Sequence, residues 1–187
     1  YNIPEDSVTR RQRSNAKTVN FGIIYGVSAF GLSQQTDLNR IESKEMIDTY
    51  YKSYPKLKEY MSSQIQYARE NGFVSTLLKR RRYLKDINSQ NAIVRGAAER
   101  TAINAPVQGS AADIIKLAMI QIDKKIHTEK LQSRMILQVH DELVFDVPKE
   151  EKDVLSKIVK IEMENALELK VPLVVDLETG ENWLEAH

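Results

Sequence analysis

The sequence predicts an α+β protein. Helical patterns fill most of the first half, and apolar strands with amphipathic helices beside them follow in the second half. The 187 residues suffice for one domain or two small ones. With 28% charged and 42% hydrophobic residues, the composition is that of an ordinary globular protein.

Helices are expected where apolar residues recur at three- and four-residue spacing between stop signals. Their expected ranges are 8–25, 44–54, 56–70, 93–103 and 110–126, with a sixth helix beginning at Pro148. Asp6 or Ser7 is placed to cap the first helix, and Gly26 is placed to end it. Gly72 has the same position after the third helix.

Pro106 is expected to separate the fourth helix from the fifth, whose start at Ser110–Asp113 has the form of a capping box. Asp113 is therefore interpreted as a cap rather than a metal ligand. Strands are expected over residues 73–78, 134–140, 143–147 and 171–177. The second and third strands are separated by Asp141-Glu142, which predicts a hairpin.

Composition and charge limit the classes of function. The chain has no cysteine, which excludes disulfides, thiol nucleophiles and cysteine-based metal sites. No apolar run approaches the roughly 20 residues of a membrane span. Residues 1–100 hold 17 Lys and Arg against 10 Asp and Glu, and residues 101–187 hold 10 against 16. The basic half suggests a polyanionic partner, and the acidic half suggests a cation site.

A row of side chains at four-residue spacing is the first candidate site. It consists of Arg13, Lys17, Phe21 and Tyr25. The row drifts only about 120° around a helix, so its members share one face. Cations at one end suit phosphates, and flat rings at the other suit a base or sugar. A solvated basic turn followed by core aromatics fits the same spacing. Gly22 is unfavourable inside a helix, which suggests that something approaches the backbone there.

The predicted hairpin tip His140-Asp141-Glu142 is the second candidate site. Adjacent carboxylates repel each other, and a hard divalent cation such as Mg²⁺ would offset the repulsion. Neighbouring strand residues point to opposite faces, so only one carboxylate need be a direct ligand. A solvated acidic turn is the other interpretation.

Two further groups could bind a nucleic acid. Arg80, Arg81 and Arg82 could follow a phosphate backbone, or could be a solvated charge run. A second row at four-residue spacing consists of Arg100, Asn104 and Gln108. These side chains can hydrogen-bond to bases or sugars, although capping around Pro106 explains them equally well.

Together these motifs resemble family A DNA polymerases, the bacterial DNA polymerase I type. The matching segments are, in order, residues 13–26, 80–83, 99–113 and 138–142. The resemblance extends from about Ser7 to Trp183. It implies a helical fingers subdomain at residues 1–92, followed at 93–187 by part of a palm with an antiparallel sheet backed by helices.

The resemblance implies that Asp141, Glu142 and Lys17 are the catalytic residues. Asp141 would ligate the two Mg²⁺ ions of the complete active site, with Glu142 close to them and to the primer end. The residues in contact with primer–template DNA would be Arg82, Arg100, Asn104, Gln108 and His140.

The same resemblance assigns the nucleotide site to the first helix. Arg13 and Lys17 would hold the triphosphate of a deoxynucleotide. Phe21 would pack on its sugar and base, and family members with Phe here tend to discriminate against nucleotides that lack the 3′-hydroxyl. Tyr25 would lie beside the template base and help to exclude a 2′-hydroxyl.

The implied reaction is template-directed nucleotidyl transfer in DNA replication or repair. The primer 3′-hydroxyl attacks the α-phosphate and pyrophosphate leaves. The implied partners are primer–template DNA and deoxynucleoside triphosphates, without a membrane. The full-length enzyme is expected to be a monomer in the bacterial cytoplasm, associated with the nucleoid.

The sequence departs from the family pattern at two places. The family's other metal-binding aspartate belongs to a motif upstream of the fingers helix, and no such motif precedes Arg13. We therefore expect a C-terminal fingers and palm fragment that is inactive or nearly so alone. Lys79 and Lys85 stand where glycine and proline are common, and we interpret them as tolerated surface changes.

Two alternatives stay open. A related single-subunit RNA polymerase shares the spacing from Lys17 to Tyr25 and the His-Asp pair, but Phe21 and Glu142 fit the DNA enzymes better. Nucleotide selection would separate the two. A non-catalytic nucleic-acid-binding module would use the basic half to bind phosphates, and its hairpin would be structural only. Replacement of Asp141 would then leave DNA binding unchanged.

Overall fold

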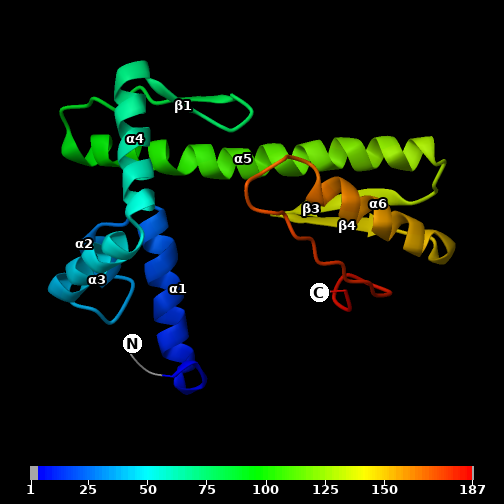
Figure 1. Cartoon of the computed structure of the whole chain (residues 1–187), viewed down its shortest axis with the longest axis horizontal. Helices are drawn as coiled ribbons and strands as arrows, with labels where there is room; N and C mark the ends of the chain where they lie inside the picture. The colour runs from blue at the N-terminus through cyan, green and yellow to red at the C-terminus, as the bar shows by residue number, and fades with distance from the viewer. Residues whose placement is uncertain (1–3, 187) are drawn as a thin grey trace. The chain divides into compact units, whose positions relative to one another are not determined.

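The computed structural model describes residues 4–186. They form two compact units, which meet in the sequence between Gln108 and Gly109. Six α-helices and two antiparallel two-stranded sheets lie within the described residues (Figure 1), which confirms the predicted α+β class. Among residues 4–186, no helix combines the length and the hydropathy that a membrane crossing requires.

The first unit is mainly helical. Its elements are a 3-10 turn (Glu5–Ser7), α1 (Arg10–Ile24), α2 (Ala29–Ser33), α3 (Arg40–Ser53), α4 (Pro55–Asn71), β1 (Phe73–Ser75), β2 (Arg81–Tyr83) and the first part of α5 (Ala92–Thr128). The predicted strand at 73–78 is thus only three residues long, because a turn begins at Thr76.

The ends of α1 were predicted only in part. Its N-cap is Thr9, whose hydroxyl accepts from the Gln12 amide while the Gln12 side chain accepts from the Thr9 amide. The expectation of a cap at Asp6 or Ser7 is therefore wrong, because this reciprocal pair satisfies the free amides two residues later. Gly26 ends the helix as predicted, with a φ of 74° that glycine adopts at little cost.

The helices α3 and α4 were also predicted only in part. α3 begins four residues before its predicted start, because the Asn39 side chain accepts from the amides of Ile41 and Glu42. α4 ends at Gly72 as predicted, with a φ of 76°. A glycine stop can be recognised in the sequence, but the choice among several possible caps depends on packing.

The prediction of a break at Pro106 is wrong. α5 is continuous from Ala92 to Thr128 with Pro106 inside it. A proline removes one helical hydrogen bond and disturbs the preceding turn. The Tyr60 hydroxyl of α4 donates to the Ile103 carbonyl in that turn, at 3.4 Å. Asp113 is consequently a buried residue in the middle of a helix, and its interpretation as an N-terminal cap is also wrong.

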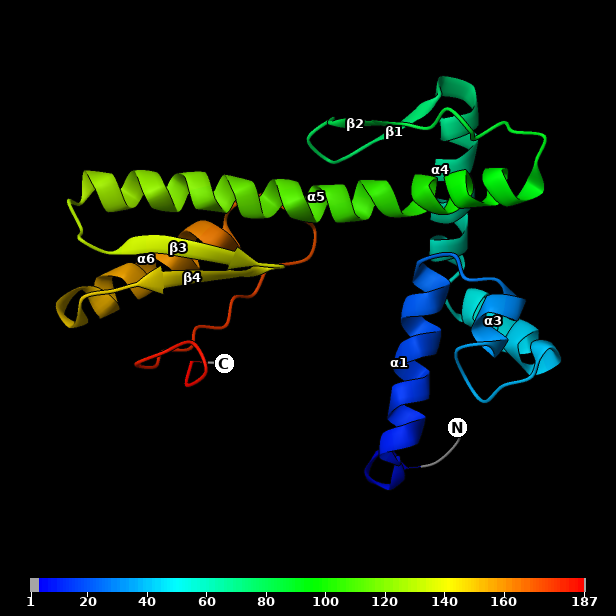
Figure 2. The same ribbon diagram turned by 180° about the vertical axis from the view of Figure 1, so that it is seen from behind.

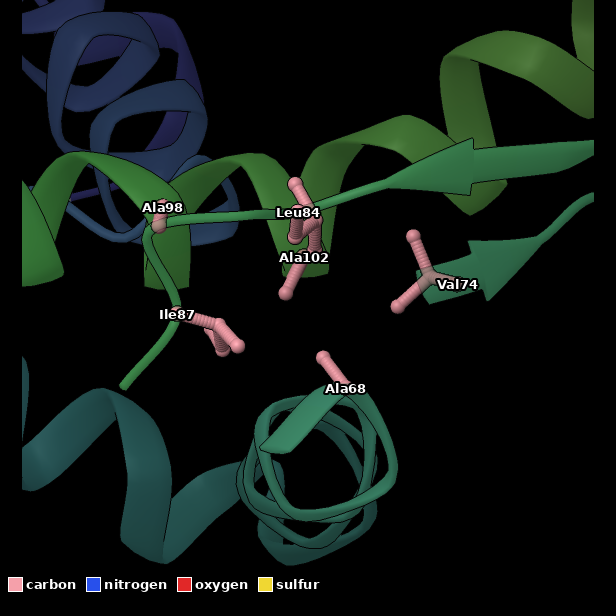
Figure 3. Close-up of a cluster of buried hydrophobic side chains, with 6 residues drawn as sticks. All are labelled: Ala68, Val74, Leu84, Ile87, Ala98 and Ala102. Carbon is pink, nitrogen blue, oxygen red and sulfur yellow. The ribbon is translucent and has the colours of Figure 1, made fainter. Parts of the chain in front are cut away.

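Two apolar clusters hold the first unit together. One joins α4, the β1–β2 hairpin and α5, as Figure 3 shows, and consists of Ala68, Val74, Leu84, Ile87, Ala98 and Ala102. The other lies between α1, α2 and α3 around Val19, Ile23 and Leu32. Ile23 and Leu32 are fully buried, so α1 keeps its apolar side inward and its opposite face free for other contacts.

The second unit packs a hairpin against helices. After the last part of α5 come β3 (Arg134–Val139), β4 (Glu142–Asp146), a 3-10 turn (Lys149–Glu151) and α6 (Lys152–Glu164). α6 covers one face of the hairpin (Figure 2). The buried cluster consists of Ala118, Ile122, Ile126, Leu155 and Val159, with Met135, Leu143 and Phe145 of the hairpin packed against it.

Glu151 fixes the start of β3 through one carboxylate. It accepts from the amides of Gln132 and Ser133 at 2.8 and 2.9 Å, and from the Ser133 hydroxyl at 2.6 Å. These hydrogen bonds lower the pKa of Glu151 because they favour its charged form, and the bond from the Gln132 amide contributes most. The carboxylate therefore joins the 3-10 turn before α6 to the strand that leads to the hairpin tip.

The hairpin turn lies one residue earlier than predicted. Val139 pairs with Glu142, so His140 and Asp141 form the two-residue turn and Glu142 begins β4. This register directs Leu143 and Phe145 to the buried cluster. His140 takes a φ of 53°, which the favoured two-residue turns require.

The predicted strand at 171–177 is wrong. These residues form no ladder with any strand in the part of the chain that the structure describes, where β3 and β4 pair only with each other. Val171 and Val174 are largely exposed. Apolar β-branched residues predict a strand, but a strand also needs a neighbouring edge with which to pair.

The backbone of Lys79, which stands where glycine is common, is strained. Its φ is 66° in the turn between β1 and β2, where its amide donates to the Thr76 carbonyl at 2.9 Å. A side chain at this φ costs about 1–2 kcal/mol, partly offset by the greater freedom of glycine in the unfolded chain. We expect Lys79→Gly to raise the free energy of unfolding by about 0.5–1 kcal/mol in urea titrations.

Lys79→Ala is the matched control for this prediction. It removes the same charge beside Arg80 and Arg81 but keeps a Cβ atom at the strained position. An equal gain in both variants would show that charge repulsion, and not backbone strain, is the cause.

Candidate functional site

The exposed face of α1 borders an open hollow of about 550 Å³ in the first unit. The lining residues are Lys17, Thr18, Phe21, Gly22, Tyr25, Val27, Gln35 and Arg100. Three of the four residues in the predicted row therefore line the same hollow. Arg13, the fourth, is exposed one helical turn nearer the start of α1.

Two aromatic rings give this hollow a flat wall. The rings of Phe21 and Tyr25 are stacked, with centroids 6.4 Å apart and planes 17° apart. Phe21 is 46% and Tyr25 40% exposed, although both are large aromatic residues. The Lys17 ammonium lies 5.9 Å from the centroid of Phe21. A cation beside stacked, water-exposed rings matches the phosphate and base ends of a nucleotide.

Arg100 brings a second cation to the hollow from α5. Its side chain passes close to Gly26, where a Cβ atom would be in ordinary contact with Cγ of Arg100 at 3.4 Å. The neighbouring Glu99 instead accepts from Arg69 of α4 at 2.6 Å. Of the two adjacent residues, Glu99 thus joins two helices while Arg100 borders the site.

The opposite side of α1 is held by polar contacts that no motif indicated. The Asp37 carboxylate lies 2.7 Å from the Arg11 guanidinium and accepts from the Asn15 amide at 3.1 Å. These contacts lower the pKa of Asp37, and the hydrogen bond from Asn15 contributes most to this shift. The Tyr50 hydroxyl of α3 donates to Asn20 at 2.6 Å. Residues from the loop after α2 and from α3 therefore fix α1 on the side away from its exposed face.

Gly22 has a packing reason within the chain. A Cβ atom at this position would lie 3.1 Å from Cγ1 of Val27, tighter than ordinary side-chain contact. The approach inferred from the sequence is therefore explained by Val27, although Gly22 also borders the hollow. Gln35 lines the same hollow from the turn after α2, and no spacing in the sequence connects it to α1.

The predicted DNA-contacting residues of the first unit lie on two elements. Arg82 is exposed on β2, opposite Val74 of β1. Asn104 and Gln108 follow Arg100 at successive turns of α5, so the three share one side of that helix. Asn104 is half-buried and Gln108 is exposed.

The remaining predicted residues lie at the hairpin tip of the second unit. His140 and Asp141 form the turn, and Glu142 is the first residue of β4. All three side chains are exposed. The Gln138 side chain donates to the His140 carbonyl at 3.0 Å, which braces the turn.

The donor chemistry of this tip fits a divalent cation in part. Carboxylate oxygen is the ligand that Mg²⁺ prefers, and Asp141 presents it at an open turn. Within residues 4–186, no group of three or more His, Asp or Glu side chains gathers in a way that could hold a metal. The fit is incomplete, because the turn and its first strand residue bring only two neighbouring carboxylates, those of Asp141 and Glu142, within the described residues.

The chain belongs to DNA polymerase family A. The sequence model of that family matches residues 1–185. A solved structure, the POL domain of Pol1 from M. smegmatis in complex with DNA primer-template and dNTP, superposes with a TM-score of 0.93. It is 44% identical, and the match covers 98% of this chain and 32% of that one.

Among curated proteins the chain is similar to bacterial DNA polymerases I. It is 55% identical to that of Caldicellulosiruptor bescii over 178 residues, which are 95% of this chain. It is 50% identical to that of Bacillus caldotenax over 186 residues, which are 100% of this chain. Each match covers 21% of the relative, so the chain spans about a fifth of the length of these proteins.

Proposed function

We propose that this chain is the fingers and C-terminal palm portion of a DNA-directed DNA polymerase. The observation that carries the proposal is the exposed face of α1, where Lys17, Phe21 and Tyr25 line one hollow with Arg100. Membership of DNA polymerase family A supports the same substrate class. The fingers are proposed to comprise residues 1–92 and the palm portion residues 93–187.

The proposed nucleotide site follows the direction of α1. Arg13 and Lys17 hold the triphosphate of a deoxynucleotide, because an arginine fork and a lysine point charge are suited to phosphate oxygens. Phe21 packs against the sugar and base, which favours nucleotides with a 3′-hydroxyl. Tyr25 lies at the insertion position beside the template base and helps to exclude a 2′-hydroxyl.

The proposed DNA contacts come from both units. They are made by Arg82, Arg100, Asn104, Gln108 and His140. Amide and guanidinium groups at these positions can donate to base edges, sugars and phosphates. Such contacts follow the backbone and groove geometry of the DNA and do not read its sequence. The template base therefore determines which nucleotide is added, and the protein selects for the shape of a correct base pair.

The proposed catalytic residues are Asp141, Glu142 and Lys17. Asp141 ligates the metal and Glu142 lies close to it. Two bound Mg²⁺ ions would activate the primer hydroxyl and neutralise charge on the leaving pyrophosphate. The role of this chain is to hold carboxylates and cations in position before the reaction begins. Proteins assist phosphoryl transfer mostly through such positioning and charge.

The proposal is tested by primer extension with Mg²⁺ and all four deoxynucleotides. This chain is compared with one extended N-terminally through the palm motif that carries the second aspartate. We expect extension only by the longer chain, because Asp141 and Glu142 supply an incomplete set of ligands. The complete protein is proposed to act as a monomer in the bacterial cytoplasm.

Each other outcome has its own meaning. Activity in neither chain favours a binding module, and incorporation of ribonucleotides in preference favours an RNA polymerase. Activity in the short chain would place a second metal carboxylate within these residues.

A further inference from the structure

The β1–β2 hairpin has two faces, and the proposed function uses only one of them. Val74 and the opposite Arg82 belong to the first face, and Val74 points into the buried cluster (Figure 3). Side chains alternate along a strand, so Phe73, Tyr83 and Arg81 belong to the other face. This second face carries no role in the site described above.

Three rings and a guanidinium gather on that second face. The Phe73 ring lies 5.8 Å from Tyr67 of α4 and 5.8 Å from Tyr83. The Arg81 guanidinium lies over the Phe73 ring, 4.4 Å from its centroid. We call Tyr67, Phe73, Arg81 and Tyr83 the ring face.

The ring face presents much of its aromatic surface to water. Tyr83 is 65% exposed and Tyr67 is 41% exposed. An aromatic residue that only anchored the hairpin to α4 would bury its ring, as the half-buried Phe73 does. The outer parts of Tyr67 and Tyr83 are therefore available for another flat group.

The charge around the ring face selects an anionic partner. Residues 73–85 contain five Lys and Arg and no Asp or Glu. Exposed rings among cations are the combination that binds single-stranded nucleic acids, where bases stack on aromatics and phosphates meet positive charge. In a duplex the base faces are covered by their neighbours, so stacking of this kind requires unpaired bases.

We propose that the ring face binds single-stranded DNA by stacking unpaired bases on Tyr83 and Tyr67, with Arg81 neutralising the adjacent phosphate. This surface is distinct from the α1 hollow, and it lies on the hairpin face opposite Arg82. The inference goes beyond the proposed nucleotidyl transfer and does not require it, because binding of a strand without a primer is measured independently.

The test uses a 20-nucleotide oligo-dT and a blunt duplex of equal length, each followed by fluorescence anisotropy with the longer polymerase chain. Tyr83→Leu is expected to weaken oligo-dT binding about tenfold, since it removes one stacking ring. Tyr83→Phe keeps the ring and should bind as the unsubstituted protein does. Affinity for the blunt duplex should change less than twofold in both variants.

Controls separate stacking from general damage. Tyr54→Leu removes another largely exposed tyrosine, in a different part of the first unit, and should leave oligo-dT binding unchanged. Arg81→Gln should reduce the slope of log affinity against log salt by about 0.7, whereas Arg40→Gln should not. Unfolding by circular dichroism confirms that each variant is folded.

Equal affinity of Tyr83→Leu and the unsubstituted protein for oligo-dT would overturn the proposal. Equal weakening of oligo-dT and duplex would overturn it as well, because the residue would then serve general DNA binding. Deoxynucleotide incorporation by the unsubstituted protein is recorded in parallel. Its failure would count against the proposed function, while the strand-binding comparison still decides the ring face.

Discussion

Asp141→Ala in a complete polymerase is expected to lower the rate of primer extension by at least about a thousandfold. The carboxylate lies in the two-residue turn of the hairpin, exposed and beside Glu142. A metal that holds reacting phosphate oxygens lowers the barrier by several kcal/mol, and loss of a ligand removes most of that effect. Single-turnover incorporation of one deoxynucleotide measures the rate directly.

The hairpin provides a matched control for this prediction. Asp146 is an exposed aspartate at the far end of β4, and Asp146→Ala should leave the rate within about twofold. Asp141→Asn keeps a turn-forming side chain but lacks the anionic charge, and it should be as defective as the alanine variant. Affinity for primer–template DNA should change little in all three variants.

Retention of activity in Asp141→Ala would contradict the metal role. The hairpin would then be structural, as in the binding-module alternative. Loss of DNA binding together with loss of activity would instead indicate that the turn is damaged, and Asp141→Asn decides between these explanations.

The fold was predictable where a single residue type determines the local geometry. Gly26 and Gly72 mark the ends of α1 and α4 because their positive φ values suit glycine. At Pro106 the prediction failed because packing outweighs the preference of a single residue. Propensity disfavours proline inside a helix, but burial of Ala98 and Ala102 and the hydrogen bond from Tyr60 hold α5 together through that turn.

The residues of the candidate site were also predictable only in part. The four-residue spacing in α1 predicted that Lys17, Phe21 and Tyr25 share a face, and they line one hollow. Arg100 reaches that hollow from α5, and Gln35 reaches it from the turn after α2. Helical periodicity describes only one element at a time, so it had no means of placing residues that tertiary packing brings together.

Lys79 shows how an interpretation from sequence can be incomplete. It is an exposed residue, as a tolerated surface change should be. Its φ of 66° nevertheless places a lysine where glycine would be unstrained. Side-chain exposure and backbone conformation are independent, and a sequence pattern without a turn assignment reports only the first.

Lys17→Ala is expected to raise the apparent KM for deoxynucleotides by about 10- to 100-fold, the range of a lost charge-assisted hydrogen bond. The Lys17 ammonium lies beside the Phe21 ring on the wall of the hollow, so its loss removes charge from the proposed triphosphate end and leaves the ring. Affinity for primer–template DNA should change less than about twofold, because α1 is proposed to bind the nucleotide. Steady-state incorporation and equilibrium DNA binding measure the two effects separately.

Lys52→Ala tests whether any exposed lysine of the first unit would do the same. Lys52 lies in the last turn of α3 and does not line the hollow, so its removal should leave both the KM and DNA affinity unchanged. Lys17→Arg should recover part of the lost nucleotide affinity, because a cation returns to the same face. If Lys17→Ala weakened DNA and nucleotide binding equally, its charge would act through the general field of the basic half, and the assignment of α1 to the triphosphate would fail.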